Sequence, residues 1–447
     1  MAKETSLAKW VFLVLAICVL LVVAVLLLTP ANKPKNRIDY LAEYNRISKP
    51  ANFDPNDNAA PYFDKAFELM VDAPDDFETL KKLWPADMND DQLQIVKKWL
   101  DANKQTLDYL KQAISKRYYW KPRVFDNNEP LMMVDLNDVK LFRKAVYLLG
   151  LEAKLMAYQG QTEPALRQLA DVYKMGTFLA GPKTLIEQLV GIAVSANAVV
   201  SAFQILDKTN PSSAILEGFQ KQITSLSCGR PFLIDMAPER LMFDDGVRQF
   251  FTGREDVNFS ENPDLYFRKL FLGTVGRPWA AWERRKADIM YGYVAAAAHK
   301  TPWELHKEGN DVDIVTDRMI KGTLFLRMLA PAVSRVLFIS YRVQVQTDAL
   351  IATTAILRYK ADTSRYPNDL QGLVTAGYLV DLPKDPFGGG PLTYKLSGDN
   401  FELYSFAEDL DDDGGRHDAS WACEGDGDYV FWPVQKIETT KRTKKQN

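Results

Sequence analysis

The residues best suited to chemistry are the carboxylates of an acidic stretch near the C-terminus. Residues 399–428 contain eleven acidic residues and one basic residue, Arg416, so the stretch has a net charge of −10. Asp409, Asp411 and Asp413 alternate along the chain, and Gly414 follows them. Calcium loops of the EF-hand type begin with oxygen ligands at alternate positions and then a glycine. The stretch is therefore a candidate metal site.

The second half of the stretch departs from an EF-hand. The twelfth position, which would supply a bidentate Glu, is Ser420, and the flanking sequence does not predict a pair of helices. Asp426 and Asp428 offer further carboxylates from the far side of the loop. Crowded carboxylates repel one another by kcal/mol amounts unless a cation neutralises them. Calcium accepts six to eight oxygens in irregular geometry, so we expect calcium here. A solvated acidic loop without metal is the alternative.

No other motif with a defined reaction mechanism occurs in the sequence. It lacks a phosphate-binding glycine loop, G-x-S-x-G, H-E-x-x-H and C-x-x-C. His299 and His306 are separated by a helix start at Pro302, which favours surface or core histidines over metal ligands. The formal net charge of −3 argues against a general nucleic-acid binder.

An enzyme with its site in the helical part of the chain remains an alternative. The candidate paired acids are Asp75 with Asp76 and Asp244 with Asp245. Neighbouring residues on a helix point apart, so such pairs are poor catalytic dyads. We therefore expect a protein that is not an enzyme, and the sequence identifies no small-molecule substrate.

An ordered series of short motifs fills the last hundred residues. It runs Leu357-Arg358-Tyr359-Lys360-Ala361-Asp362, Arg365-Tyr366-Pro367, Gly377-Tyr378-Leu379, Leu382-Pro383-Lys384-Asp385-Pro386-Phe387-Gly388, Tyr404-Ser405-Phe406-Ala407-Glu408-Asp409 and Asp428-Tyr429-Val430-Phe431-Trp432. This order, from about Thr347 to Pro433, resembles the globular domain of the major pseudopilin of type II secretion systems. The resemblance implies a small α+β domain that serves protein–protein contact on the outer face of a bacterial inner membrane.

The resemblance also implies which residues hold calcium. That family places one Asp just after the second strand and another just before the closing aromatic strand. The matching positions are Asp409 and Asp428, with Ser405 near the start of the loop. Spacing alone adds Asp411, Asp413 and Asp426. The predicted ligands are thus Asp409, Asp411, Asp413, Asp426, Asp428 and Ser405.

The elements that must position this loop can be read from periodicity and turn signals. Residues 330–362 predict one long amphipathic helix, and Leu370, Leu373 and Leu379 indicate a short second helix. Residues 393–396 and 401–406 flank the turn sequence Ser397-Gly398-Asp399-Asn400 and predict a hairpin. Residues 429–432 predict a third strand. We expect a three-stranded antiparallel sheet packed on the long helix.

The N-terminal region predicts a membrane anchor. Residues 10–28 contain no charge, and nineteen helical residues span about 30 Å, the thickness of a bilayer core. A cleaved signal peptide is the alternative. Lysines flank the run on both sides, so they do not set its orientation. Pseudopilins carry a prepilin leader and a Glu within the apolar run, and this chain has neither, which argues against assembly into a fibre by the usual helix.

The middle of the chain predicts a helical domain. Residues 182–206 are apolar but interrupted by Lys183, Glu187 and Gln188, which favours a buried helix over a second membrane span. Thr301-Pro302-Trp303-Glu304 is a helix start with a capping box. Gly160 followed by Ala165 matches one turn of a tetratricopeptide-like repeat, a weak signal. Cys18, Cys228 and Cys423 permit one disulfide at most among the latter two.

Together these patterns predict a mainly α protein. Its expected parts are an anchor (1–30), a linker (31–60), a helical, repeat-like domain (61–330), an α+β pseudopilin-like domain (331–435) and a basic tail (436–447). We expect a single-pass inner-membrane protein with its bulk in the periplasm, anchored through residues 10–28. It would bind calcium and protein partners in or near a type II secretion or pilus-like system. A helical-repeat scaffold capped by the C-terminal domain is the alternative.

Overall fold

The computed structural model describes residues 38–124, 131–133, 136–228, 230–252, 277–329, 333–421 and 426–435. The predicted anchor at 10–28, Cys18, Cys423 and the basic tail lie outside the described residues. Whether Cys228 pairs with Cys423, which the sequence left open, is therefore untested, and Cys228 is exposed and has no disulfide partner among the described residues.

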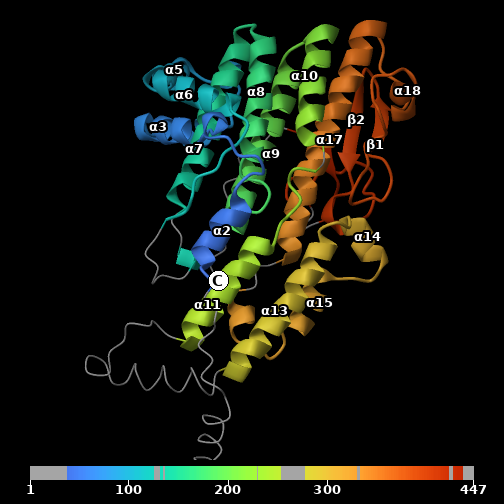
Figure 1. Ribbon diagram of the computed structural model, residues 1–447. Coiled ribbons are helices and arrows are strands. Elements are labelled where there is room, and N and C mark those ends of the chain that lie inside the picture. Colours follow the sequence, from blue (N-terminus) through green and yellow to red (C-terminus); the bar gives the residue numbers. More distant parts are fainter. Residues whose placement is uncertain are drawn as a thin grey trace, which may run out of the picture.

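The described chain is mainly helical and carries a small three-stranded antiparallel sheet near its C-terminus (Figure 1). The α-helices are α2 (Tyr40–Ser48), α3 (Ala60–Leu69), α4 (Phe77–Leu80), α5 (Asp90–Ala102), α6 (Lys104–Ser115), α7 (Asn137–Tyr158), α8 (Thr162–Thr177), α9 (Leu185–Lys208), α10 (Ser213–Ser227), α11 (Ala237–Thr252), α13 (Arg277–Ala297), α14 (Pro302–Lys307), α15 (Val312–Met319), α16 (Phe325–Leu329), α17 (Val333–Thr363) and α18 (Leu370–Thr375). The strands are β1 (Thr393–Ser397), β2 (Asn400–Ser405) and β3 (Tyr429–Trp432).

Helix α17 is the element on which the sheet rests. It packs against α9 and α10 on one side and against β2, β3 and α18 on the other (Figure 1). Its buried residues, among them Leu337, Val345, Leu350 and Ile356, are distributed around the helix. A helix that is apolar on all sides belongs inside a protein. The predicted helix at 330–362 is confirmed, with observed bounds of 333 and 363.

The predicted three-stranded antiparallel sheet is present. Strand β2 lies between β1 and β3, and Leu403 pairs with Trp432 across the β2–β3 ladder. Gly398, with φ of 58°, takes the left-handed conformation that the β1–β2 turn requires. The rings of Phe401 and Trp432 stack at 5.4 Å between centroids, so the two strands are also joined by side chains. The three predicted strands are confirmed within one residue at each end.

Helix α9 is covered by α7, α8 and α17. It is the one helix among the described residues that is long and apolar enough to cross a membrane, and 56% of its most apolar window is buried within the protein. Helices α8 and α9 approach closely at two glycines. A Cβ on Gly176 would lie only 2.5 Å from the carbonyl oxygen of Gly191, so a larger residue would not fit there. This burial agrees with the prediction of a core helix for 182–206.

A buried ionic network attaches α2 to the helical part. The Arg123 guanidinium donates to Glu187 Oε1 at 2.6 Å and to Asp138 Oδ1 at 2.9 Å, and Tyr44 donates to Glu187 Oε2 at 2.8 Å. Burial opposes the charge on Glu187, but Lys183 and Arg123 outweigh it and hold the pKa of that carboxyl below its usual value. The region predicted as a linker therefore contains a helix, α2, fixed by paired buried charges.

The helical part and the sheet share one hydrophobic core. Buried residues from Ala59 to Trp432 form a single contiguous cluster, and the side chains of α17 belong to it throughout. The predicted division into domains at residue 330 stays a prediction. The capping box predicted at Thr301 is confirmed, because Thr301 accepts from the Glu304 amide at 3.1 Å and Glu304 accepts from the Thr301 amide at 2.8 Å.

Asp348, a largely buried carboxyl on α17, gives the stability of this core a pH dependence. Burial raises its pKa to about 6, while a hydrogen bond from Gln344 opposes the shift. Because the folded-state pKa lies above the unfolded one, the folded chain holds the proton more tightly. The resulting stabilisation is complete below about pH 4 and is lost as the pH rises through about 6.

We therefore expect Asp348→Asn, which cannot ionise, to be more stable than the wild type at about pH 7, by on the order of 1–3 kcal/mol. The difference should shrink toward about pH 4, where the wild-type carboxyl is protonated. Urea unfolding at both pH values measures it, and Asp381→Asn, at an exposed position, is the matched control. An equal difference at both pH values would contradict this account.

Candidate metal centre

The acidic loop begins where β2 ends, and two contacts fix its first residues. Asp385, from the Lys384-Asp385-Pro386 turn, accepts from the Ser405 hydroxyl at 2.7 Å and from the Phe406 amide at 2.9 Å. Glu408 pairs with Arg342 of α17. These contacts hold the backbone of the loop against the long helix immediately before Asp409.

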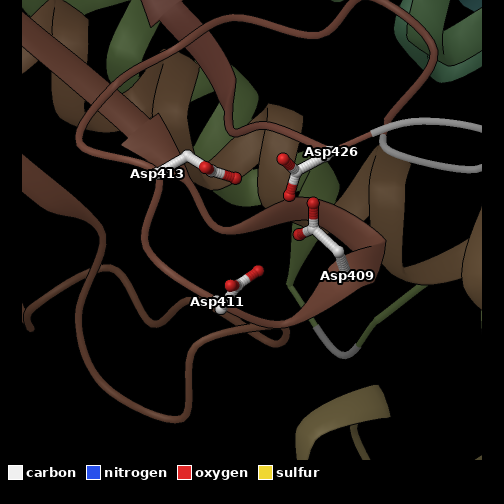
Figure 2. Close-up of side chains that lie close together, drawn as sticks. All are labelled: Asp409, Asp411, Asp413 and Asp426. Carbon is white, nitrogen blue, oxygen red and sulfur yellow. The ribbon is translucent and has the colours of Figure 1, made fainter.

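The chain then turns so that alternate carboxylates face one another. Ala407 and Leu410 have positive φ angles of 60° and 68°, which is unusual for residues with a side chain. They bracket a short 3-10 turn that includes Asp409. Figure 2 shows the carboxylates of Asp409, Asp411 and Asp426 directed toward a common space, with Asp413 beside it.

Four of the six predicted ligands form this cluster. Asp409, Asp411, Asp413 and Asp426 each offer one carboxylate oxygen, and these oxygens all lie within 4.8 Å of one another. Asp409 and Asp413 are partly buried, whereas Asp411 and Asp426 are exposed. The cluster thus joins the start of the loop to its end, directly before β3. Four carboxylates at this spacing could hold a metal ion.

The other two predicted ligands are not in the cluster. Ser405 is fully buried and donates its hydroxyl to Asp385. Asp428 is also fully buried, and its Oδ2 accepts from the Gly415 amide at 2.7 Å. Its Oδ1 has no hydrogen-bond partner among the described residues. In this arrangement both residues support the loop through these hydrogen bonds. Their predicted role as ligands stays a prediction.

Two oxygens of the cluster have no hydrogen-bond partner among the described residues. Asp409 Oδ1 and Asp413 Oδ2 are buried atoms without a hydrogen-bond partner among the described residues. Unpartnered buried carboxylate oxygens are costly, since burial and like charge both oppose ionisation. Burial, followed by the charges of Asp411 and Asp413, raises the pKa of Asp409. A bound cation would reverse these effects, so the donor set fits a metal ion.

Arg416 already neutralises part of this charge. Its guanidinium donates to Asp413 Oδ1 at 2.7 Å and also contacts Asp426 Oδ2. Arg416 is largely exposed, so its pairs are screened by solvent. Asp412 points elsewhere, because its Oδ1 accepts from the Tyr404 hydroxyl at 2.9 Å. The arginine therefore bridges Asp413 and Asp426 on one side of the cluster. It does not contact the side formed by Asp409 and Asp411.

Sequence reasoning missed Asp385, Arg342 and Arg416. Asp385 lies in a motif that was noted for its prolines, and burial raises its pKa against several backbone hydrogen bonds. Gly388, three residues after Asp385, was the available signal in the sequence. In the structure a Cβ at this position would lie 3.1 Å from Asp385 Oδ2. Arg342 and Arg416 become meaningful only once the fold brings them to Glu408 and Asp413.

The acid pairs considered for catalysis have structural partners instead. Asp244 pairs with Arg240 at 2.7 Å, whereas Asp245 accepts from the Leu131 amide at 2.7 Å and pairs with Arg248. Their carboxylates thus bind different groups. Asp75 and Asp76 are exposed residues before α4. Within the described ranges, these acids form no metal-binding group with one another or with a histidine.

No family model matches the chain, and no curated protein and no solved structure is significantly similar to it.

We expect calcium to raise the melting temperature of the protein and Asp409→Asn to abolish the rise. A site that binds only the folded chain stabilises it by about 2.7 kcal/mol at a ligand concentration about 100-fold above Kd. Thermal unfolding of the full chain with calcium or with chelator measures the shift. Asp399→Asn, an exposed acid of the same stretch outside the cluster, is the matched control and should keep the rise.

Asp428→Asn distinguishes the two views of that residue. If Asp428 is a ligand, as the resemblance implies, its substitution should also abolish the calcium-induced rise. If Asp428 only supports the loop through Gly415, calcium should still raise the melting temperature of the variant, although its melting temperature without calcium should differ from that of the wild type. No shift in the wild type with calcium would refute the metal site itself.

Proposed function

We propose that this protein is a membrane-anchored, non-enzymatic envelope protein whose calcium-binding, pseudopilin-like domain mediates protein–protein contact. The observation that carries the proposal is the cluster of Asp409, Asp411, Asp413 and Asp426 between β2 and β3. It lies in the loop where the resemblance to major pseudopilins implies calcium. The order of long helix, short helix and three antiparallel strands supports the same proposal.

The proposed setting is the periplasmic side of a bacterial inner membrane, in or near a type II secretion or pilus-like system. The uncharged run at 10–28 supports a single-pass anchor. The apolar run at 10–28 contains no Glu, whereas the corresponding run of pseudopilins carries one. We therefore propose a partner of such a machine, which presents a calcium-stiffened domain without becoming a subunit of the fibre.

A scaffold capped by the sheet is the second candidate, and one observation favours it. The sheet and the helices share a continuous core through α17. In a scaffold the sheet would close that core, and the metal cluster would serve stability alone. The two candidates differ in whether loss of calcium changes partner binding or only the melting temperature.

We expect partner recovery to depend on calcium and on Asp409. Full-length protein cross-linked in its native membrane should retain envelope partners with calcium and lose them with chelator. Asp409→Asn should lose the same partners, whereas Asp399→Asn should keep them. Point variants are preferable to truncation after Val333, because removing α17 would uncover α9 and α10. Equal recovery from all variants would favour the capped scaffold.

We expect Cys228 to be reachable from the periplasm. It is exposed at the end of α10, so it reports the side on which the helical part lies. In a Cys18→Ser, Cys423→Ser background, a membrane-impermeant maleimide should label intact spheroplasts as fully as lysed ones. Cys228→Ser provides the blank. Labelling that appears only after lysis would place the bulk of the chain in the cytoplasm.

A further inference from the structure

One face of α13 exposes large apolar side chains at helical spacing. Trp279, Trp282 and Ile289 are 50%, 38% and 50% exposed. Positions three and seven residues apart lie on the same side of a helix, so these residues form one stripe. The buried side of α13, which includes Ala287 and Met290, directly adjoins this stripe. The stripe is therefore an apolar face that no described part of the chain covers.

The stripe continues onto the turn before α16. Trp282 extends over this turn, since a Cβ on Gly322 would lie 3.2 Å from the Trp282 ring. Glu283 is fully buried beneath it and accepts from the amides of Leu324 at 2.5 Å and Leu326 at 3.1 Å. This carboxylate caps the start of α16 and fixes it to α13.

The fixed turn adds two further apolar side chains, Leu324 and Met328, which are 51% and 73% exposed. They lie four residues apart and so share a side of the chain at α16. We call Trp279, Trp282, Ile289, Leu324 and Met328 together the tryptophan face.

Basic side chains are interspersed with the tryptophan face. Lys286 lies 5.9 Å from the centroid of the Trp282 ring, and Arg285, Lys321 and Arg327 are exposed on the same two elements. The exposed acid of this side of α13, Asp288, pairs with Arg240 at 2.7 Å. Tryptophan with Lys and Arg around apolar residues is the composition of surfaces that lie in a membrane interface.

The length of chain before the described residues brings this end of the molecule near the bilayer. Nine residues separate the predicted anchor, ending at Leu28, from Ile38. Fully extended, they span about 30 Å at most. Helix α2 follows at once and packs on α11, which in turn packs on α13 and α16 (Figure 1). The anchor thus tethers the side of the molecule that carries the tryptophan face.

We propose that the tryptophan face docks on the anionic phospholipid surface of the membrane that the anchor spans. This inference rests on the proposed anchor and adds a second, peripheral contact. Trp279, Trp282 and Ile289 enter the headgroup region, and Arg285, Lys286, Lys321 and Arg327 meet the lipid phosphates. Two contacts, the anchor and the tryptophan face, fix the orientation of the protein relative to the bilayer.

The test places an environment-sensitive fluorophore at single cysteines of the full chain in a Cys18→Ser, Cys228→Ser, Cys423→Ser background. The reporting position is Ile289→Cys. Val380→Cys, 84% exposed and five residues after α18, which lies at the opposite end of the view from α13 in Figure 1, is the matched control. Leu20→Cys reports the anchor. Each protein is placed, one copy per disc, in nanodiscs of phosphatidylcholine with phosphatidylglycerol, with or without brominated acyl chains that quench nearby fluorophores.

We expect brominated lipid to quench the fluorophore at positions 289 and 20 but not at 380. Replacing phosphatidylglycerol by phosphatidylcholine, or combining Arg285→Gln with Lys286→Gln, should reduce the quenching at 289 and leave that at 20 unchanged. Quenching at 20 without quenching at 289 would overturn the docking and keep the anchor. In that case, blue-shifted emission at 289 would show that protein covers the face. No quenching at 20 would overturn the anchor and this inference with it.

Discussion

The position of α17 between two layers determines how the rest of the chain is arranged. A helix of 31 residues with buried side chains around its circumference requires partners on opposite sides. Helices α9 and α10 supply one layer, and β2, β3 and α18 supply the other. A small sheet gains stability by packing an apolar face against a helix. The sheet therefore depends on α17 for its stability. Because the loop between β2 and β3 joins two strands that pack on α17, both ends of the loop are fixed.

Paired charges and hydrogen bonds hold the chain in place just before the metal cluster. Glu408 is paired with Arg342 of α17, and Asp385 receives the Ser405 hydroxyl and the Phe406 amide. These contacts satisfy the acids next to the turn. In the cluster itself Arg416 pairs with Asp413 and Asp426, while Asp409 Oδ1 and Asp413 Oδ2 have no hydrogen-bond partner among the described residues. The fold holds the four carboxylates close together despite their mutual repulsion. A cation that neutralises them relieves this repulsion, which favours its binding.

Local patterns in the sequence were sufficient for the elements that carry the site. The long helix at 333–363, the hairpin around Gly398 and the strand at 429–432 follow from periodicity and turn residues. The alternate spacing of Asp409, Asp411 and Asp413 identified three cluster members, because it depends only on neighbours along the chain. Asp426 was predicted, together with Asp428, as a carboxylate from the far side of the loop.

What the sequence did not reveal depends on contacts between distant residues. The network of Arg123, Asp138 and Glu187 joins three segments, and no short pattern announces it. The shared core around α17 appears only when both layers are in place. Asp428 and Ser405 were assigned by position relative to the strands, but burial and backbone donors decide where such side chains point. Non-local packing thus decides between ligand and support.

Calcium titration of the full-length protein by isothermal calorimetry tests the central claim most directly. The account predicts saturable binding of calcium to the wild type at one site, a loss of that binding in Asp409→Asn, and unchanged binding in Asp399→Asn. A wild-type protein that shows no heat of calcium binding, or an Asp409→Asn variant that binds as the wild type does, would contradict it.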